Sequence, residues 1–215
     1  GVSAVMKELL PILHGDALTV TGKTIAENLA AVAAPDRAII KTIEDPWRKE
    51  GGLAVLHGNL APNTAVTKPA AIHPDMQTFT GKAHCFDSEE AANEAILQGK
   101  VIAGEVVVIR YEGPKGGPGM REMYKAMKLL YGRGLALTTA LITDGRFSGT
   151  NNGCFVGHIS PEAAEGGPLA IVKNGDEITI GITERKLHLH LPDIKIQNRL
   201  KKWQRPAPKF KSGYL

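Results

Sequence analysis

From residue 53 onward, short apolar segments alternate with helix-like segments that carry start and stop signals, and this alternation most restricts the fold. Apolar runs of roughly four to eight residues bounded by turn-forming residues are typical of strands. The predicted strands are Leu53–His57, Lys82–Phe86, Val106–Arg110, Ala136–Thr143, Cys154–His158, Leu169–Lys173, Glu177–Ile180 and Lys186–Leu191. We therefore expect an α/β domain, with a closed, β-barrel-like sheet flanked by helices.

The helices between these strands are predicted from capping signals. Ser88 is a suitable N-cap residue, and the helix that follows it would end at Gly99. A second helix is expected over Met120–Tyr131. Ser160-Pro161-Glu162 indicates the start of a third, and Asn174-Gly175 is typical of a hairpin turn.

The chain before this domain reads differently. Residues 1–13 have the apolar spacing of a short helix, and Thr24 with Glu27 matches a capping box for a second helix, ending near Ala33. Residues 34–52 are polar and rich in turn formers, which is typical of a linker.

Composition excludes several classes of protein. With 43% hydrophobic and 22% charged residues, the chain can bury a core, so overall disorder is not expected. Cys85 and Cys154 are the only cysteines, which excludes a disulfide framework, a cysteine-built zinc site and an iron–sulfur cluster held by this chain alone. No apolar run reaches the roughly 20 residues that span a bilayer, so we expect a cytoplasmic protein without membrane contact.

The net charge of +4 comes from one end of the sequence. Residues 194–215 hold seven basic residues and no acidic one, and the rest of the chain carries 19 basic and 22 acidic residues. A basic tail can bind nucleic acid, but it lacks a recognition motif. We therefore expect a solvated or partner-docking tail and no nucleic acid partner.

The first stretch that could carry chemistry is Tyr111–Met123, YEGPKGGPGMREM. Its glycines allow close approach of a ligand to the backbone, and N–H groups at the start of the following helix could receive an anion. Two interpretations of Glu122 remain open: a carboxylate favoured by the helix dipole in the first turn, or an oxygen ligand for Mg²⁺.

The second stretch is Leu141–Gly157, where an apolar strand runs into DGRFSG. A glycine-rich turn at the carboxyl end of a strand is the usual place for ligand chemistry in α/β folds. Ser148 could be an activated hydroxyl, with Arg146 supplying positive charge for a substrate carboxylate. The alternative is an Asx-type turn at Asp144, with Ser148 acting as a cap.

The histidines are less informative. His158 follows a strand, where a structural role is the more common one. His188 and His190 alternate with leucines and share one face of a strand, but the sequence offers no third ligand for zinc.

Four ordered segments carry a resemblance to a known family: GVSAVMKELLPILHGDALTVTGKT, GPKGGPGMREM, ITDGRFSG and GHISPEAAEGGPLA. They resemble the dihydroxy-acid dehydratase/6-phosphogluconate dehydratase family over about residues 1–205. The resemblance implies a hydro-lyase that converts a 2,3-dihydroxy acid to a 2-keto acid with an iron–sulfur cluster and Mg²⁺. It also implies that Ser148 is the catalytic base and Glu122 a metal ligand.

The resemblance further implies the domain organisation. Residues 1–52 would end an N-terminal domain and form a linker, residues 53–205 would form a swivelling C-terminal domain, and residues 206–215 a basic tail. The N-terminal domain of the same enzyme would supply the cluster cysteines and the remaining Mg²⁺ ligands, so the chain alone would be inactive. A homodimer is expected.

The substrate is a small hydroxy acid that Arg146, Gly149 and Asn151 are expected to bind. The wording of the motifs favours dihydroxy-acid dehydratases of branched-chain amino-acid biosynthesis. Arg121 stands where those enzymes usually show proline, and residues 150–154 differ from their continuation. A sugar acid (aldonate) is therefore an alternative substrate. A non-catalytic ligand-binding module is the alternative from another class.

Overall fold

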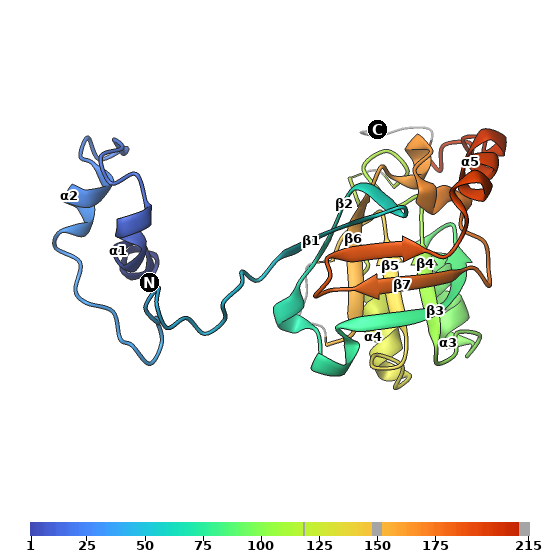
Figure 1. Cartoon of the computed structure of the whole chain (residues 1–215), viewed down its shortest axis with the longest axis horizontal. Coiled ribbons are helices and arrows are strands. Elements are labelled where there is room, and N and C mark those ends of the chain that lie inside the picture. The colour runs from blue at the N-terminus through green and yellow to red at the C-terminus, as the bar shows by residue number, and fades with distance from the viewer. Residues whose placement is uncertain (118, 148–151, 211–215) are drawn as a thin grey trace. The chain divides into compact units, whose positions relative to one another are not determined.

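The computed structural model describes residues 1–117, 119–147 and 152–210 (Figure 1). The chain forms two compact units that divide between Gly51 and Gly52. Ser148, Gly149 and Asn151 lie outside the described residues.

The first unit, Gly1–Gly51, holds two short helices, α1 (Val2–Leu9) and α2 (Ile25–Leu29). The first predicted helix ends as a 3₁₀ turn over Leu10–Ile12. The capping box is confirmed: the N–H of Glu27 donates to Thr24 Oγ1 at 3.2 Å, and the N–H of Thr24 donates to Glu27 Oε2 at 2.7 Å. Leu29 is the one buried residue of this unit, so the unit has almost no core of its own.

The second unit is a closed barrel, which confirms the predicted α/β class with a closed sheet (Figure 1). In the described residues its strands are β1 (Ala54–Gly58), β2 (Ala61–Thr67), β3 (Thr78–Phe86), β4 (Glu105–Ile109), β5 (Ala140–Thr143), β6 (Cys154–Ser160), β7 (Glu177–Gly181) and β8 (Lys186–Leu189). The order around the barrel is β1-β2-β6-β5-β4-β3-β7-β8. Strands β3, β4, β5 and β6 run parallel, and the neighbours β1 and β8 close the barrel.

The central strand β4 is buried on both faces. Val106 and Val108 point into the barrel core, whereas Val107 and Ile109 pack in a second apolar cluster with helices α3 (Glu89–Leu97) and α4 (Tyr124–Gly132). Strands covered on both faces read as continuous apolar runs, which explains why β4 and β5 stand out in the sequence. The two helices pack together against this side of the sheet.

Two predictions about strands were wrong. Strand β2, APNTAVT, was not predicted, because proline, asparagine and alanine have low strand propensity; pairing with β1 and β6 imposes the extended form. Residues 169–173, predicted as a strand, instead enter a buried 3₁₀ turn over Pro168–Ile171. Asn174-Gly175 is therefore no hairpin, and Asn174 Oδ1 accepts from the N–H of Cys85 at 2.7 Å.

The ends of two other predicted elements also differ. The helix signal at Ser160-Pro161 belongs to the end of β6, and only a 3₁₀ turn over Ala163–Glu165 follows. Helix α5 (Asp193–Lys202) occupies part of the segment expected as a solvated tail. Its Ile196 is buried, and its Arg199 forms an ion pair with Asp176.

Candidate functional site

The two glycine-rich motifs lie at one end of the sheet because their strands are neighbours. Strands β4 and β5 run parallel, with Ile109 paired to Thr143, so both chains leave the sheet side by side. The first motif loop begins directly after β4 and the second directly after β5. This is the position at which α/β folds bind ligands.

The two loops are joined by a short parallel bridge that pairs Glu122 with Arg146. The N–H of Arg146 donates to the carbonyl of Arg121 at 3.1 Å, and the N–H of Met123 donates to the carbonyl of Arg146 at 2.8 Å. Arg146 Nε also donates to the carbonyl of Met120 at 2.7 Å. Two predicted site residues from different motifs are thus held at one place by backbone hydrogen bonds.

Glu122 does not serve the start of helix α4, as one interpretation of the sequence had it. The helix begins at Tyr124 with Met123 as its N-cap residue, and its first turn contains no acidic residue. The carboxylate that supports this helix start is Glu89 of α3, whose Oε1 accepts from the N–H of Ala126 at 3.3 Å. Glu122 is partly buried and lies in the bridge, outside the helix.

Asp144 holds three segments together beneath the two loops. Its carboxylate accepts from the N–H groups of Tyr111 at 3.1 Å, Glu112 at 3.0 Å and Ala163 at 2.9 Å. Burial raises the pKa of the Asp144 carboxyl, and these backbone hydrogen bonds oppose that rise. The local Asx-type turn expected at Asp144 is replaced by these long-range bonds.

Three successive N–H groups of the glycine-rich loop, those of residues 115–117, already donate hydrogen bonds within the chain. Glu162 accepts from the N–H of Lys115 at 2.9 Å and from the N–H of Gly116 at 3.0 Å, and the N–H of Gly117 donates to Gly113. Glu162 thus binds part of the loop backbone, and at the start of the following helix, where the sequence allows a bound anion, Glu89 accepts from the N–H of Ala126.

His158 is nearer to this site than its sequence context indicated. Its backbone is left-handed, with φ of 55°, and its N–H donates to the carbonyl of Gly145 at 2.8 Å. The exposed side chain lines an open cleft of about 540 Å³ together with Met120 and Glu162. Burial and the neighbouring Arg146 lower the pKa of the imidazole.

The ends of the second motif loop are anchored although its centre lies outside the described residues. Phe147 stacks on Phe155 with ring centroids 5.8 Å apart. On the far side, the N–H of Asn152 donates to the Tyr131 hydroxyl, and the Asn152 carbonyl accepts from His73 at 2.9 Å. The residues predicted as base and substrate contacts lie between these anchors in the sequence.

The thiols do not fit the requirements of a cluster ligand. Cys154 is buried in the barrel core, and Cys85 lies partly buried on β3. Burial raises the pKa of each thiol to about 12, so both are protonated at neutral pH, whereas cluster ligands are thiolates.

A complete metal site is also absent from the part of the chain that the structure describes, which has no group of three or more His, Cys, Asp or Glu suited to a metal ion. His188 and His190 lie with ring centroids 4.9 Å apart, and His190 Nε2 is 2.8 Å from the Thr179 hydroxyl. The Glu122 carboxylate has the oxygen chemistry that a hard divalent cation prefers.

No helix in the described ranges combines the length and apolar character needed to cross a membrane.

Residues 38–215 match the family model described as dihydroxy-acid/6-phosphogluconate dehydratase C-terminal. The chain is 54% identical over 217 residues to a dihydroxy-acid dehydratase of Acetivibrio thermocellus and 53% identical over 217 residues to one of Aquifex aeolicus. In both comparisons all of this chain is covered, and it spans 39% of the relative's length. The chain belongs to the dihydroxy-acid/6-phosphogluconate dehydratase family, of which it carries the C-terminal region.

Proposed function

We propose that this chain is the C-terminal part of a hydro-lyase that dehydrates a 2,3-dihydroxy acid to a 2-keto acid. The observation that carries the proposal is the bridge between Glu122 and Arg146, because it brings the two motif loops together at the carboxyl end of the sheet. Relatives that bear the name dihydroxy-acid dehydratase share about half of their aligned residues with this chain, which supports the same activity.

In this proposal the ionised Ser148 oxygen takes the proton from C2 of the substrate, the bond between C3 and its hydroxyl oxygen breaks, and the departing hydroxide takes up one proton and leaves as water. Ser148 later gives up the proton from C2, so that one water molecule is lost in all. The resulting enol rearranges to the 2-keto acid. Mg²⁺, when bound, supplies positive charge that acidifies the substrate and stabilises an ionised serine oxygen. Glu122 would donate one oxygen ligand to that ion, and Arg146 would attract the substrate carboxylate.

The iron–sulfur cluster of the proposed enzyme would be bound outside this chain. Cys154 is enclosed in the barrel core, and neither it nor Cys85 belongs to a group of metal-ligating side chains in the described residues, so the cluster would take its ligands from elsewhere. The remaining metal ligands would also come from the N-terminal domain of the same protein. We further propose a cytoplasmic homodimer whose C-terminal domain swivels over the N-terminal one.

The substrate is proposed to be a branched 2,3-dihydroxy acid: the relatives' names specify a dihydroxy acid, and the motifs favour the branched-chain enzymes. An aldonate is the second candidate. It is favoured by Arg121, which replaces the usual proline beside Glu122, and by the exposed Asn152 at the end of the second motif loop. Turnover of 2,3-dihydroxy-3-methylbutanoate against a panel of aldonates distinguishes the two.

The test of the function uses the full-length protein with its cluster reconstituted under anaerobic conditions and 2-keto acid formation as the readout. Ser148→Ala should abolish turnover while the melting temperature stays unchanged, because it removes only the hydroxyl that accepts the proton. Glu122→Gln should raise the Mg²⁺ concentration needed for half-maximal activity by about tenfold or more, since an amide is the weaker ligand.

Thr138→Ala is a matched control for the serine variant, because this exposed hydroxyl lies before β5, away from both motif loops. It should leave turnover unchanged. Wild-type turnover by Ser148→Ala would contradict the role of the base, and an unchanged Mg²⁺ requirement in Glu122→Gln would contradict the role of the ligand. Binding of the acid without any turnover would favour the non-catalytic module.

A further inference from the structure

A fully buried glutamate lies behind the two motif loops. Glu112, three residues after the end of β4, has no exposed side-chain surface. Its Oε1 accepts from the N–H of Glu89 at 2.9 Å and from Lys209 Nζ at 2.9 Å. Its Oε2 has no hydrogen-bond partner within the described part of the chain. Such a carboxylate depends strongly on the cations around it, because an unsatisfied buried acceptor is destabilising.

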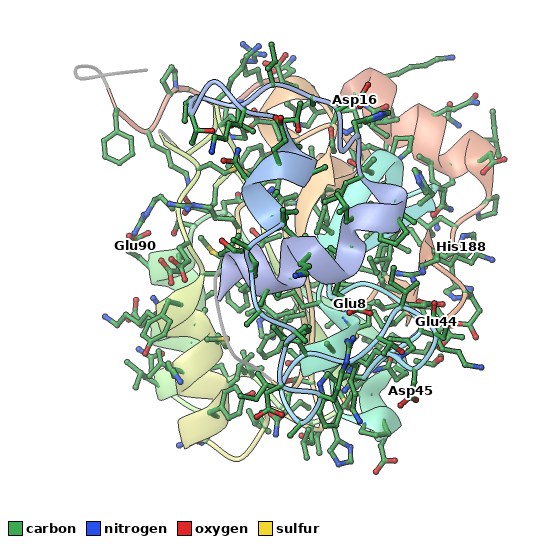
Figure 2. All side chains as sticks on the ribbon, turned by 90° about the vertical axis from the view of Figure 1, so that its left-hand side faces the viewer. Glu8, Asp16, Glu44, Asp45, Glu90 and His188 are labelled. Carbon is green, nitrogen blue, oxygen red and sulfur yellow. The ribbon has the colours of Figure 1, made fainter. Side chains whose placement is uncertain are left out.

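Arg121 is the second cation near this carboxylate. Its guanidinium lies 3.9 Å from Glu112, 3.5 Å from Glu89 and 2.6 Å from Glu90. Figure 2 labels Glu90 near the start of α3. The hydrogen bond to Glu90 raises the pKa of Arg121, so the guanidinium stays charged. Arg121 is thus shared among three carboxylates.

This network contacts the backbone on both sides of Glu122. Arg121 directly precedes it, and the Arg121 carbonyl accepts the N–H of Arg146 in the bridge. After Glu122, the carboxylate of Glu89 holds the N–H of Ala126 in the first turn of α4. The position of Glu122 therefore depends on where Arg121 and Glu89 lie.

Lys209 reaches this network from the far end of the sequence. We call residues 203–210 the C-terminal strap. The strap is held on the barrel by Trp203 Nε1, which donates to the Tyr111 hydroxyl at 3.3 Å, and by an ion pair between Arg205 and Glu165. It covers a cavity of about 320 Å³ that Tyr111 and Lys209 help to line. The Lys209 side chain is 27% exposed, so its charge is partly withdrawn from water.

Removal of the Lys209 charge has a definite consequence. The Glu112 carboxylate would lose its closest cation, and Arg121 would be the remaining cation beside it. Movement of the guanidinium from Glu90 toward Glu112 would compensate for the loss. That movement would pull on the residue next to Glu122 and on the bridge to Arg146.

We propose that Lys209 is a positioning residue for Glu122, acting through Glu112 and Arg121. The inference rests on the proposed function, in which Glu122 ligates the divalent cation. It assigns the C-terminal strap to the metal half of the site, which the strap reaches through Tyr111 and Glu112.

The test measures Mn²⁺ binding to the full-length protein by electron paramagnetic resonance, because Mn²⁺ takes the same oxygen ligands as Mg²⁺. Lys209→Met should weaken Mn²⁺ binding by about tenfold, the size typical of groups that orient a metal ligand. Lys209→Arg should stay within about twofold of the wild type. The control Lys202→Met removes an exposed lysine at the end of α5 and should leave binding unchanged.

A second variant separates positioning from general stability. Lys209→Met combined with Glu112→Gln removes the uncompensated charge together with its partner, so it should recover part of the Mn²⁺ affinity. Binding by Lys209→Met within twofold of the wild type, while Glu122→Gln binds weakly, would overturn the inference alone. Unchanged binding by Glu122→Gln would instead overturn the metal role within the proposed function.

Discussion

Asp144 is the residue whose role changes most between sequence and structure. In the sequence it appears as part of a local turn in DGRFSG. In the structure its two oxygens bind backbone N–H groups from the loop after β4 and from the segment after β6. One buried carboxylate therefore determines how the first motif loop leaves the sheet.

Asp144→Asn should destabilise the chain by about 1–3 kcal/mol, because the new amide group turns a donor toward backbone N–H groups that need an acceptor. Urea unfolding of the 215-residue chain measures this difference. The pKa of Asp144 is raised in the folded state, so folding disfavours the ionised carboxylate. The contribution of Asp144 to the free energy of unfolding is therefore largest below the ordinary pKa of 3.8 and falls as the pH rises above it. The loss caused by the asparagine should therefore be smaller at neutral pH than at pH 4.

Asp75→Asn is the matched control, since the Asp75 side chain is 88% exposed. It should change the free energy of unfolding by less than about 0.5 kcal/mol. Equal effects of the two substitutions would show that the buried hydrogen bonds of Asp144 contribute nothing specific.

The sequence could predict candidate residues only where chemistry and local spacing coincide. Glu122 and Arg146 could be proposed from their motifs, and their meeting in the bridge followed from two parallel strands. The long-range roles of Glu89, Glu112 and Glu162 could not be predicted, because each acts on backbone or cations distant in sequence. Glu162 was predicted only as part of a helix start. When an acidic residue accepts from an N–H group far away in the chain, the residues next to it in the sequence do not indicate that contact.

Among the elements, those buried on both faces could be predicted most securely. Strands β4, β5 and β6 coincide with apolar runs, whereas β2 depends on its neighbours for its extended form. Helix α5 was not predicted, because charged residues make up half of its sequence and indicate a solvent-exposed segment. A few of its side chains, among them the buried Ile196 and the ion-paired Arg199, hold it on the barrel.

Arg199→Met should destabilise the chain by about 1–3 kcal/mol at pH 7, because Arg199 forms a two-point ion pair with Asp176 and donates to the carbonyl of Ile171 at 3.1 Å. Burial raises the pKa of Asp176, but hydrogen bonds from Arg199 and from the N–H of Lys173 together lower it by more. The pKa of Asp176 in the folded chain therefore lies below the ordinary value of 3.8. The contribution of the pair to stability is therefore present above about that value and is lost as the pH falls through the lower folded pKa. Urea unfolding at pH 7 and pH 3 should show the difference between wild type and variant shrinking.

Lys201→Met, on an exposed position of the same helix, should have little effect at either pH. A loss caused by Arg199→Met that stays the same at both pH values would mean that packing of the arginine stem, and not its charge, attaches the helix.

At the scale of the whole molecule, the chain combines a barrel that has a full core with a first unit that has almost none. Only Leu29 is buried among residues 1–51, and apolar side chains such as Val2, Ile12 and Val20 are largely exposed. Helices of eight and five residues are too short to persist in water without tertiary contacts. The stability of this chain should therefore come from the barrel.

Brief trypsin treatment should cut first near Arg48 and Lys49, in the turn-rich segment before the barrel. The fragment that holds the barrel should unfold at the same temperature as the intact chain, and the released N-terminal peptide should lack helical circular dichroism. Calorimetry of the barrel fragment checks the first statement, and circular dichroism and calorimetry of the released peptide check the second. Earlier cutting within the barrel, or a cooperative transition of the peptide, would contradict them.

The parallel bridge between Glu122 and Arg146 also limits how these loops can evolve. In an extended pair, a shift of one residue turns every side chain to the opposite face. A single-residue insertion between Gly119 and Arg121 would therefore present Arg121 where the carboxylate now stands, even with all other residues intact. Variation in length at this end of the barrel is tolerable only outside the bridged residues, so a lineage that remodels its substrate pocket must do so by exchanging side chains there and not by inserting or deleting them.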